Sequence, residues 1–111
     1  MDSRVAQAIL QDHQVAYCIT NRDLKVVEVN APHWPVLPPS RASLGRSLLD
    51  LVPELVGYEE VLVEILAGQL PRLELALVNH EAPDRTNVYL TFLELPYRDE
   101  TGQIVGILHL V

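Results

Sequence analysis

The sequence predicts a single α+β domain. Its 111 residues suit one domain, and hydrophobic residues, 49% of the total, are enough to form one buried core. Residues 3–13 and 53–67 have the three-four spacing of apolar residues that is typical of amphipathic helices. Five other segments are rich in β-branched residues, leucine or aromatic residues, which is typical of strands. The predicted order is a helix, two strands, helices and three strands.

The first part of the chain is predicted to be a helix followed by a hairpin. Residues 3–13 form the helix, which has a thin apolar stripe. Residues 15–20 and 25–30 are strands, and the NRDL sequence between them has the composition of a turn. Four prolines in residues 31–40 exclude a regular helix or central strand, because proline fixes φ and lacks an N–H donor. This stretch is predicted to be an ordered loop.

Two helices are predicted in the middle of the chain. Ser47 is placed to cap a short helix. Pro53 suits the first turn of a longer helix that ends before Gly68. The residues predicted on the inner face of the longer helix are Leu55, Tyr58, Leu62, Ile65 and Leu66. The acidic residues predicted on its solvated face are Glu59, Glu60 and Glu64.

Three strands are predicted to complete the chain, at residues 72–80, 86–95 and 103–111. The last two are apolar on both faces. A sheet with two apolar faces needs two covers. The helices can cover one face, and the other requires the N-terminal helix, a partner chain or both. Because the chain stops inside an apolar strand, we expect it to be a piece of a longer protein.

Charge and cysteine content exclude several function classes. Eight Lys and Arg against fifteen Asp and Glu give a net charge of −7, which argues against direct binding to nucleic acid or to an anionic membrane. Cys18 is the only cysteine, so the chain has neither an internal disulfide nor a cysteine-based zinc site. We expect a cytoplasmic protein. The sequence has no apolar run of 18 residues and so predicts no transmembrane helix.

Three segments in the right order resemble the PAS sensor domains. AYCITNRDLKVVEVN (16–30) is similar to the opening hairpin of that family, with Asn21 where the family usually has Asp. LGRSLLDLVPEL (44–55) is similar to the segment before its long helix, and PYRDETGQIVGILHLV (96–111) to its closing hairpin. The matching positions in the closing hairpin are Pro96, Asp99, Gly102 and Gly106. The proline-rich connector departs from the family, which often has a regular helix there.

The resemblance implies a PAS-like five-stranded antiparallel sheet with helices packed on one face. It also implies an N-terminal flanking helix in residues 1–14 and a sensor domain in residues 15–111. The family usually holds a pocket or a packed core between the sheet and the long helix. It usually forms dimers through the N-terminal helix and the outer sheet face. The predicted dimer-interface residues are Val5, Ile9, Leu108 and Leu110.

The predicted pocket lining is mostly aliphatic and contains few hydrogen-bonding groups. Its candidate residues are Trp34, Tyr58, Leu62, Ile65, Leu66, Leu90 and Phe92. Alternation in the strand at 86–95 does not say whether the set Val88, Leu90 and Phe92 or the set Tyr89, Thr91 and Leu93 faces inward. Such a lining favours a small apolar ligand, such as a fatty-acid-like molecule, or a core filled by its own side chains.

Haem and flavin are both disfavoured as cofactors, and no metal site is predicted. The predicted long helix has no histidine to ligate a haem iron, and His33 in the proline-rich loop is a weak substitute. Cys18 lies on a strand, whereas the reactive cysteine of flavin-binding PAS photosensors lies in a helical motif. Cys18 is therefore predicted to be a buried structural thiol. His109 is predicted to lie on an outer face or at an interface.

The sequence thus favours a non-enzymatic sensory module of a larger cytoplasmic signalling protein. It would bind a small apolar ligand or mediate homodimerisation, and would relay a signal to an output domain. A histidine kinase of a two-component system, a cyclase or a transcription regulator would suit that role. One alternative is a small isomerase or hydrolase that uses His33, Tyr17 and Tyr89 in the cavity between sheet and helix. Another is a pure dimerisation module without a ligand.

Overall fold

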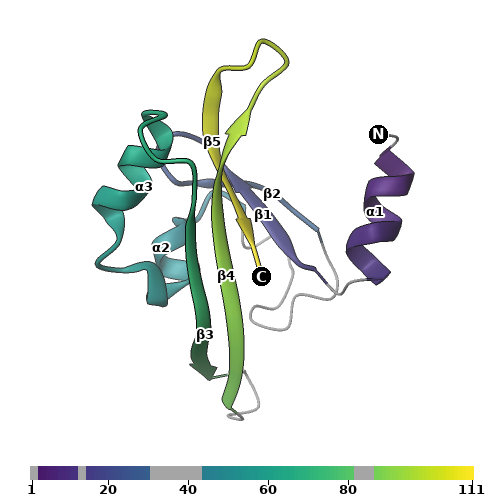
Figure 1. Ribbon diagram of the computed structural model, residues 1–111, viewed down its shortest axis with the longest axis vertical. Coiled ribbons are helices and arrows are strands. Elements are labelled where there is room, and N and C mark those ends of the chain that lie inside the picture. Colours follow the sequence, from purple (N-terminus) through teal and green to yellow (C-terminus); the bar gives the residue numbers. More distant parts are fainter. Residues whose placement is uncertain (1–2, 13–14, 31–43, 82–86) are drawn as a thin grey trace.

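A computed structural model describes residues 3–12, 15–30, 44–81 and 87–111 of the chain (Figure 1). The proline-rich stretch at 31–40, with His33 and Trp34, lies outside the described residues, as does the turn expected at 81–85 except for Glu81, which is the last residue of β3. The elements are α1 (Ser3–Asp12), β1 (Tyr17–Thr20), β2 (Val26–Val29), α2 (Leu48–Leu51), the 3-10 helix η2 (Pro53–Leu55), α3 (Glu59–Leu66), β3 (Leu73–Glu81), β4 (Asn87–Arg98) and β5 (Ile104–Leu110).

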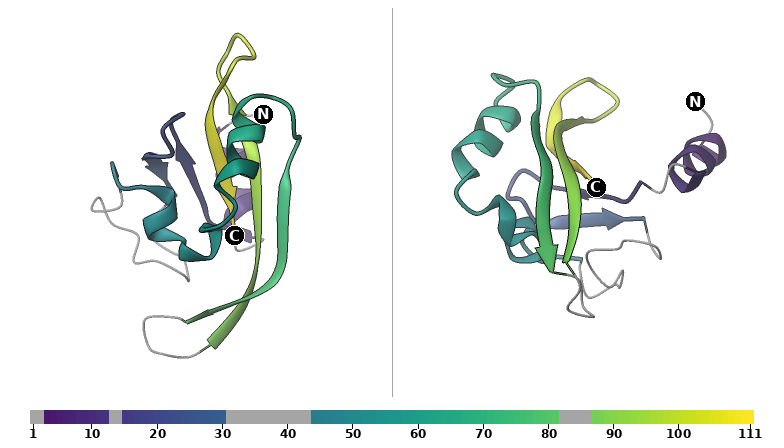
Figure 2. Two further views of the ribbon diagram at one scale, coloured as in Figure 1. Left: turned by 90° about the vertical axis from the view of Figure 1, so that its left-hand side faces the viewer. Right: turned by 60° about the horizontal axis from the view of Figure 1, so that its bottom comes forward.

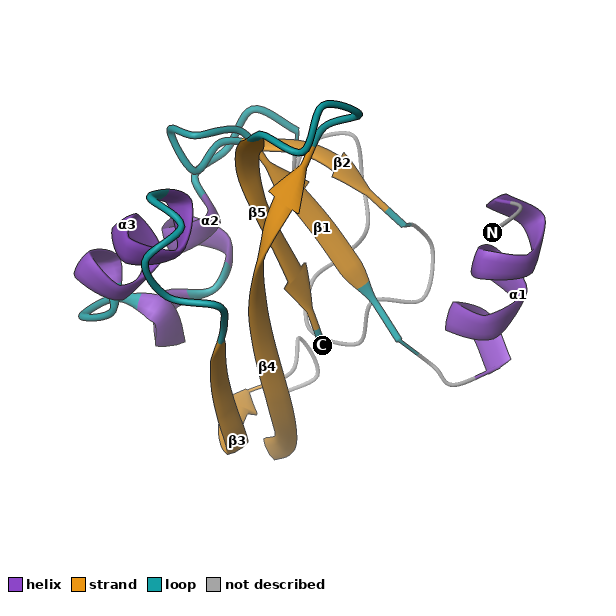
Figure 3. Ribbon diagram, turned by 45° about the horizontal axis from the view of Figure 1, so that its top comes forward, coloured by secondary structure: helices purple, strands orange, loops and turns teal. Residues whose placement is uncertain are grey.

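The five strands form one antiparallel sheet in the order β2-β1-β5-β4-β3. The helices α2 and α3 lie on one side of this sheet, and α1 lies on the other (Figures 1 and 3). Viewed from the side of the helices, α3 lies in front of β5 and β4, with which it is in contact (Figure 2). The α+β class and the five-stranded antiparallel sheet are therefore confirmed. None of the helices in the described residues is long and apolar enough to cross a membrane.

The β1–β2 hairpin is held by its turn residues. The Asn21 side-chain Oδ1 accepts hydrogen bonds from the backbone N–H groups of Asp23 (2.9 Å) and Lys25 (3.0 Å), as asparagine commonly does in turns. The Arg22 guanidinium from the same turn donates to the carbonyl oxygens of Leu66 (3.2 Å) and Ile104 (2.8 Å). Arg22 therefore joins the hairpin to the last turn of α3 and to the first residue of β5.

The expected helix at 53–67 is two helices. Pro53–Leu55 is a 3-10 turn, and α3 begins only at Glu59, so the prediction of one continuous helix was wrong. The reason is Gly57, which has a φ of +100°, outside the range of an α-helix. Ser47 does cap α2, since its Oγ accepts from the Leu49 N–H at 3.3 Å. Gly68, at a φ of +76°, follows the end of α3 as predicted.

The last hairpin is longer than expected because β4 continues to Arg98. Pro96, predicted to begin the turn, instead pairs with Ile107 inside the sheet. The turn itself is built on Asp99, whose Oδ1 accepts hydrogen bonds from the N–H groups of Thr101 (2.8 Å) and Gln103 (3.1 Å) and from the Thr101 hydroxyl (2.6 Å). These hydrogen bonds, led by that from the Thr101 hydroxyl, lower the pKa of the Asp99 carboxyl.

The core lies between the sheet and the helices α2, η2 and α3. Its largest fully buried apolar side chains come from both layers, so sheet and helices are packed as one unit. These side chains are Phe92, Leu48, Leu55, Leu62, Ile65, Ile107, Val26 and Val52.

Candidate functional site

Three ionisable side chains lie inside this apolar core, in one row across the inner face of the sheet. Cys18 of β1 pairs with His109 of β5, and His109 pairs with Glu94 of β4. Residues directly opposite each other on neighbouring strands share a face. All three residues are 0% exposed, although histidine and especially glutamate are rarely buried so completely. This row is the candidate functional site.

The centre of the row is the hydrogen-bonded pair of Glu94 and His109. His109 Nδ1 lies 2.5 Å from Glu94 Oε1, within hydrogen-bond distance. The second carboxylate oxygen, Oε2, is buried and has no hydrogen-bond partner among the residues that the structure describes. The Phe92 ring lies beside the imidazole, with ring centroids 5.5 Å apart and planes inclined at 47°. The site is thus a buried carboxyl group with one oxygen that no described residue contacts by a hydrogen bond, next to the Phe92 ring.

Burial and charge together keep the Cys18 thiol neutral. Loss of solvent is the larger cause, and the negative charge of Glu94 adds to it, raising the pKa of Cys18 to about 12. A thiolate, not a thiol, is the effective nucleophile and metal ligand. Although the order cysteine, histidine, glutamate resembles a catalytic chain, Cys18 remains an unreactive thiol at neutral pH. This agrees with its interpretation as a buried structural thiol.

The structure places most of the predicted lining residues in the core next to this row. Leu62 and Ile65 of α3 and Phe92 of β4 are fully buried, Leu66 is nearly so, and Leu90 packs against them. The inward-facing set in β4 therefore includes Leu90 and Phe92, whereas Thr91 is exposed. Tyr58 does not line the core. It is the residue before α3 and is 36% exposed. Trp34 lies outside the described residues.

Sequence reasoning missed the polar part of the site. Glu94 was not considered, and His109 was predicted to lie on an outer face or at an interface, which is wrong because it is buried beside Glu94. A signal was present: Glu94 is two residues after Phe92, and His109 is two residues after Ile107. Residues two apart on a strand share a face, so one polar residue on each strand accompanies an inward apolar one. The lining is therefore not purely aliphatic.

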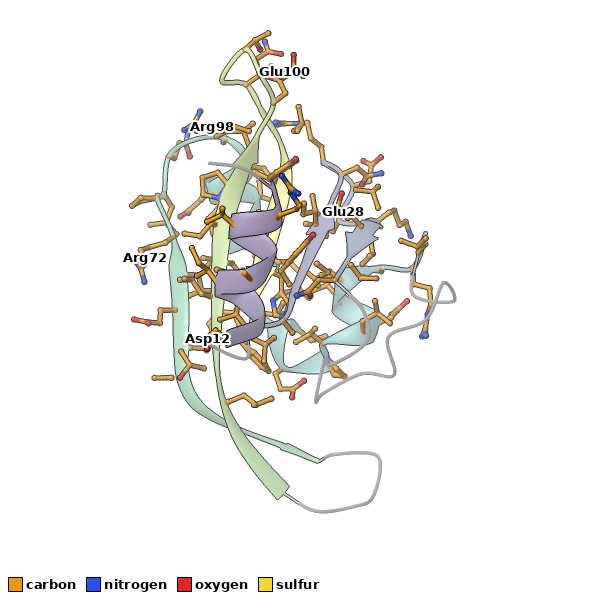
Figure 4. All side chains as sticks on the ribbon, turned by 90° about the vertical axis from the view of Figure 1, so that its right-hand side faces the viewer. Asp12, Glu28, Arg72, Arg98 and Glu100 are labelled. Carbon is orange, nitrogen blue, oxygen red and sulfur yellow. The ribbon has the colours of Figure 1, made fainter. Side chains whose placement is uncertain are left out.

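The outer face of the sheet is apolar at its centre. Leu93 and Leu95 of β4 and Leu108 and Leu110 of β5 alternate with the buried row and are partly exposed. α1 lies in front of this face, and the labelled charged residues Glu28, Arg72, Arg98 and Glu100 lie toward its edges (Figure 4). The predicted interface residues of α1, Val5 and Ile9, are 49% and 44% exposed. Neither apolar surface is fully covered within the described part of the chain.

Known structures with similar architecture include PAS domains. The PAS domain of a Colwellia psychrerythraea protein matches with a TM-score of 0.68 and 17% identity over 98% of this chain and 94% of its own. A sensory box sensor histidine kinase from Vibrio cholerae matches with a TM-score of 0.59 and 20% identity, over 97% and 89% of the two chains. The resemblance to PAS domains is confirmed at the level of the fold.

A larger protein also contains this fold. VqmA of Vibrio cholerae, described as a LuxR-type receptor, matches with a TM-score of 0.71 and 16% identity. The match covers 96% of this chain but only 49% of the VqmA chain. No family model and no curated protein matches the sequence significantly. At these identities the likeness concerns the fold alone.

Proposed function

We propose that this chain is a non-enzymatic sensory module of a larger cytoplasmic signalling protein. The observation that carries the proposal is the Glu94–His109 pair, sealed in the core of a fold that sensor proteins share. A buried pair of ionisable groups is a poor source of stability, because desolvation can cost more than the attraction returns. Two apolar side chains could fill the same space in the core. Binding of a ligand would explain why a polar pair is found there instead.

The proposed signal is a change in packing between two copies of the chain. A ligand in the core would favour the arrangement of the strands to which it binds more tightly. The packing of the two copies in the dimer would shift with that arrangement, by no more than the difference in ligand affinity between the two arrangements. Leu108 and Leu110 flank His109 on β5 and point to the opposite face. A rearrangement at His109 would therefore reach the outer face through a single strand. Residues 1–14 would act as the flanking helix of the interface, through Val5 and Ile9.

The related proteins suggest which outputs such a module serves. VqmA, which shares this fold over half of its chain, forms a dimer and has been observed bound to DPO and in a ligand–DNA complex. Similar domains occur in sensor histidine kinases. We propose an output domain of one of these kinds, or a cyclase, in the complete protein. The net charge of −7 argues against DNA contact by this module itself.

The test combines native mass spectrometry with light scattering on the purified chain. We expect a dimer that carries a noncovalent guest, seen as mass in the native spectrum that disappears on denaturation. Ile9→Glu should dissociate the dimer, whereas the control Val63→Glu, on an exposed position of α3, should not. A monomer without any guest, together with measurable turnover of small-molecule substrates, would overturn the proposal in favour of an enzyme.

A further inference from the structure

We propose that Glu94 is the anchor for a small, uncharged, largely apolar ligand that carries an N–H or O–H donor. This inference rests on the proposed sensory function and names the chemistry of its ligand. The atom concerned is Oε2 of Glu94, the buried carboxylate oxygen that has no partner within the described residues. A carboxylate accepts hydrogen bonds only, so the ligand must be the donor.

The neighbours of Glu94 leave Oε2 without a donor. On the sheet, Glu94 lies between Leu73 of β3 and His109 of β5. Along its own strand, the residues that share its face are Phe92 and Pro96. Of these four, only His109 offers a side-chain donor, and its Nδ1 is directed to the other oxygen, Oε1. An unsatisfied buried acceptor is unfavourable, and a bound donor would relieve that cost.

No other polar side chain in the described core is available to donate a hydrogen bond to Glu94 Oε2. The only buried polar or charged residues among those described are Thr20, Glu94 and His109. The Thr20 hydroxyl is already committed, since it donates to the Asn21 carbonyl at 2.8 Å and accepts from the Ile107 N–H at 3.1 Å. None of the described side chains therefore supplies the missing donor, and the proposed ligand would supply it.

The surroundings also limit the charge and polarity of the ligand. α2, η2 and α3 contribute mainly apolar side chains to the core opposite the sheet, so a cation would lose its hydration with little in return. The counter-charge on the sheet would be Glu94, which is already paired with His109. A neutral donor requires no second counter-charge. An aromatic or aliphatic frame would pack against Phe92 and the leucines opposite, and one N–H or O–H would be directed to Oε2.

The experiment compares two molecules that differ only in the donor. Indole and 1-methylindole have nearly the same shape, but only indole has an N–H. Each is titrated into the intact chain, and binding is followed by the backbone amide NMR signals of Glu94 and His109. We expect indole to bind about tenfold more tightly than 1-methylindole, since a hydrogen bond to a charged acceptor is worth at least that factor.

Two variants and a control identify the anchor. Glu94→Leu/His109→Leu replaces the pair by apolar groups that the core can accommodate, and should abolish the preference for indole. Glu94→Gln retains a neutral oxygen of similar shape and should reduce the preference severalfold, since hydrogen bonds to neutral acceptors are weaker. Glu74→Gln changes an exposed carboxylate on the neighbouring strand β3 and should leave the preference unchanged.

The outcomes separate this inference from the proposed function. Equal binding of the two probes, an unchanged preference in the double variant, or no binding of either probe would each refute Glu94 as the anchor. The same holds if crystals soaked with indole show only an ordered water on Oε2. In all these cases a guest or dimer found by mass spectrometry would leave the sensory function intact.

Discussion

Replacing Gly106 by alanine should disrupt the junction between β5 and β1. A Cβ atom at this position would lie 1.7 Å from the carbonyl oxygen of Thr20, 2.7 Å from its carbonyl carbon and 3.3 Å from Asn21 Cα. The first distance is half of the 3.4 Å at which ordinary contact begins. All three atoms belong to the backbone, so no side-chain rotation can relieve the clash. The two strands must separate instead.

The cost follows from what that separation breaks. Overpacking a core site costs about 1–3 kcal/mol. The next residue, Ile107, donates its N–H to the buried Thr20 hydroxyl at 3.1 Å, and losing that hydrogen bond adds about 1–3 kcal/mol. We therefore expect a loss of about 2–6 kcal/mol in the free energy of unfolding. That is a large share of the roughly 5–15 kcal/mol available to a domain.

Urea unfolding followed by circular dichroism measures this loss, with Gly57→Ala as the matched control. A Cβ at Gly57 would meet nothing within 4 Å, but the φ of +100° strains any side chain there, at about 1–2 kcal/mol. Gly106→Ala should therefore be clearly worse than Gly57→Ala. If Gly106→Ala lost less than its control, the close approach of β5 to β1 would be wrong.

Three further predictions concern buried side chains of the core and the hydrogen bonds that Arg22 donates to backbone carbonyls. His109→Leu should destabilise the fold by about 3–5 kcal/mol, because it leaves the Glu94 carboxyl group buried without its partner. The double variant Glu94→Leu/His109→Leu should cost much less than the sum of the two single variants, and additive losses in urea unfolding would exclude coupling. Folding raises the pKa of Cys18 from 9.0 to about 12. As the pH rises, the thiol therefore loses its proton in the unfolded chain before it does so in the folded one. Above pH 9 the free energy of unfolding should fall, with a limiting slope of about 1.4 kcal/mol per pH unit. Cys18→Ala should flatten the decrease between pH 9 and 10, and an unchanged slope would assign the titration elsewhere. Arg22→Ala should lower the melting temperature, because it removes two hydrogen bonds to backbone carbonyls. The control Arg72→Ala removes only an exposed ion pair and should cost less than about 0.5 kcal/mol of stability. Equal shifts of the melting temperature in the two variants would show that Arg22 does not hold the hairpin to α3 and β5.

Local chemistry predicted the order of the elements and several of their ends. Asn21, Ser47 and Gly68 each act on backbone groups a few residues away, so their roles as turn, cap and stop do not depend on the rest of the chain. The error at Gly57 is of another kind. The apolar residues from Leu55 to Leu66 keep their helical spacing on both sides of this glycine. Periodicity alone therefore does not detect that the backbone leaves the helix at Gly57.

The sequence by itself determined that the strands at 86–95 and 103–111 carry two apolar faces, and that the elements follow each other as in a PAS domain. It did not determine which face meets the helices, because alternation with a period of two is symmetric between the faces. Only the tertiary structure decided that Glu94 and His109 face inward and stand opposite each other. The register between β4 and β5 brings together residues 15 positions apart, and their burial in the core removes them from water. Burial of that pair, which no local pattern encodes, makes the inner face a candidate ligand site.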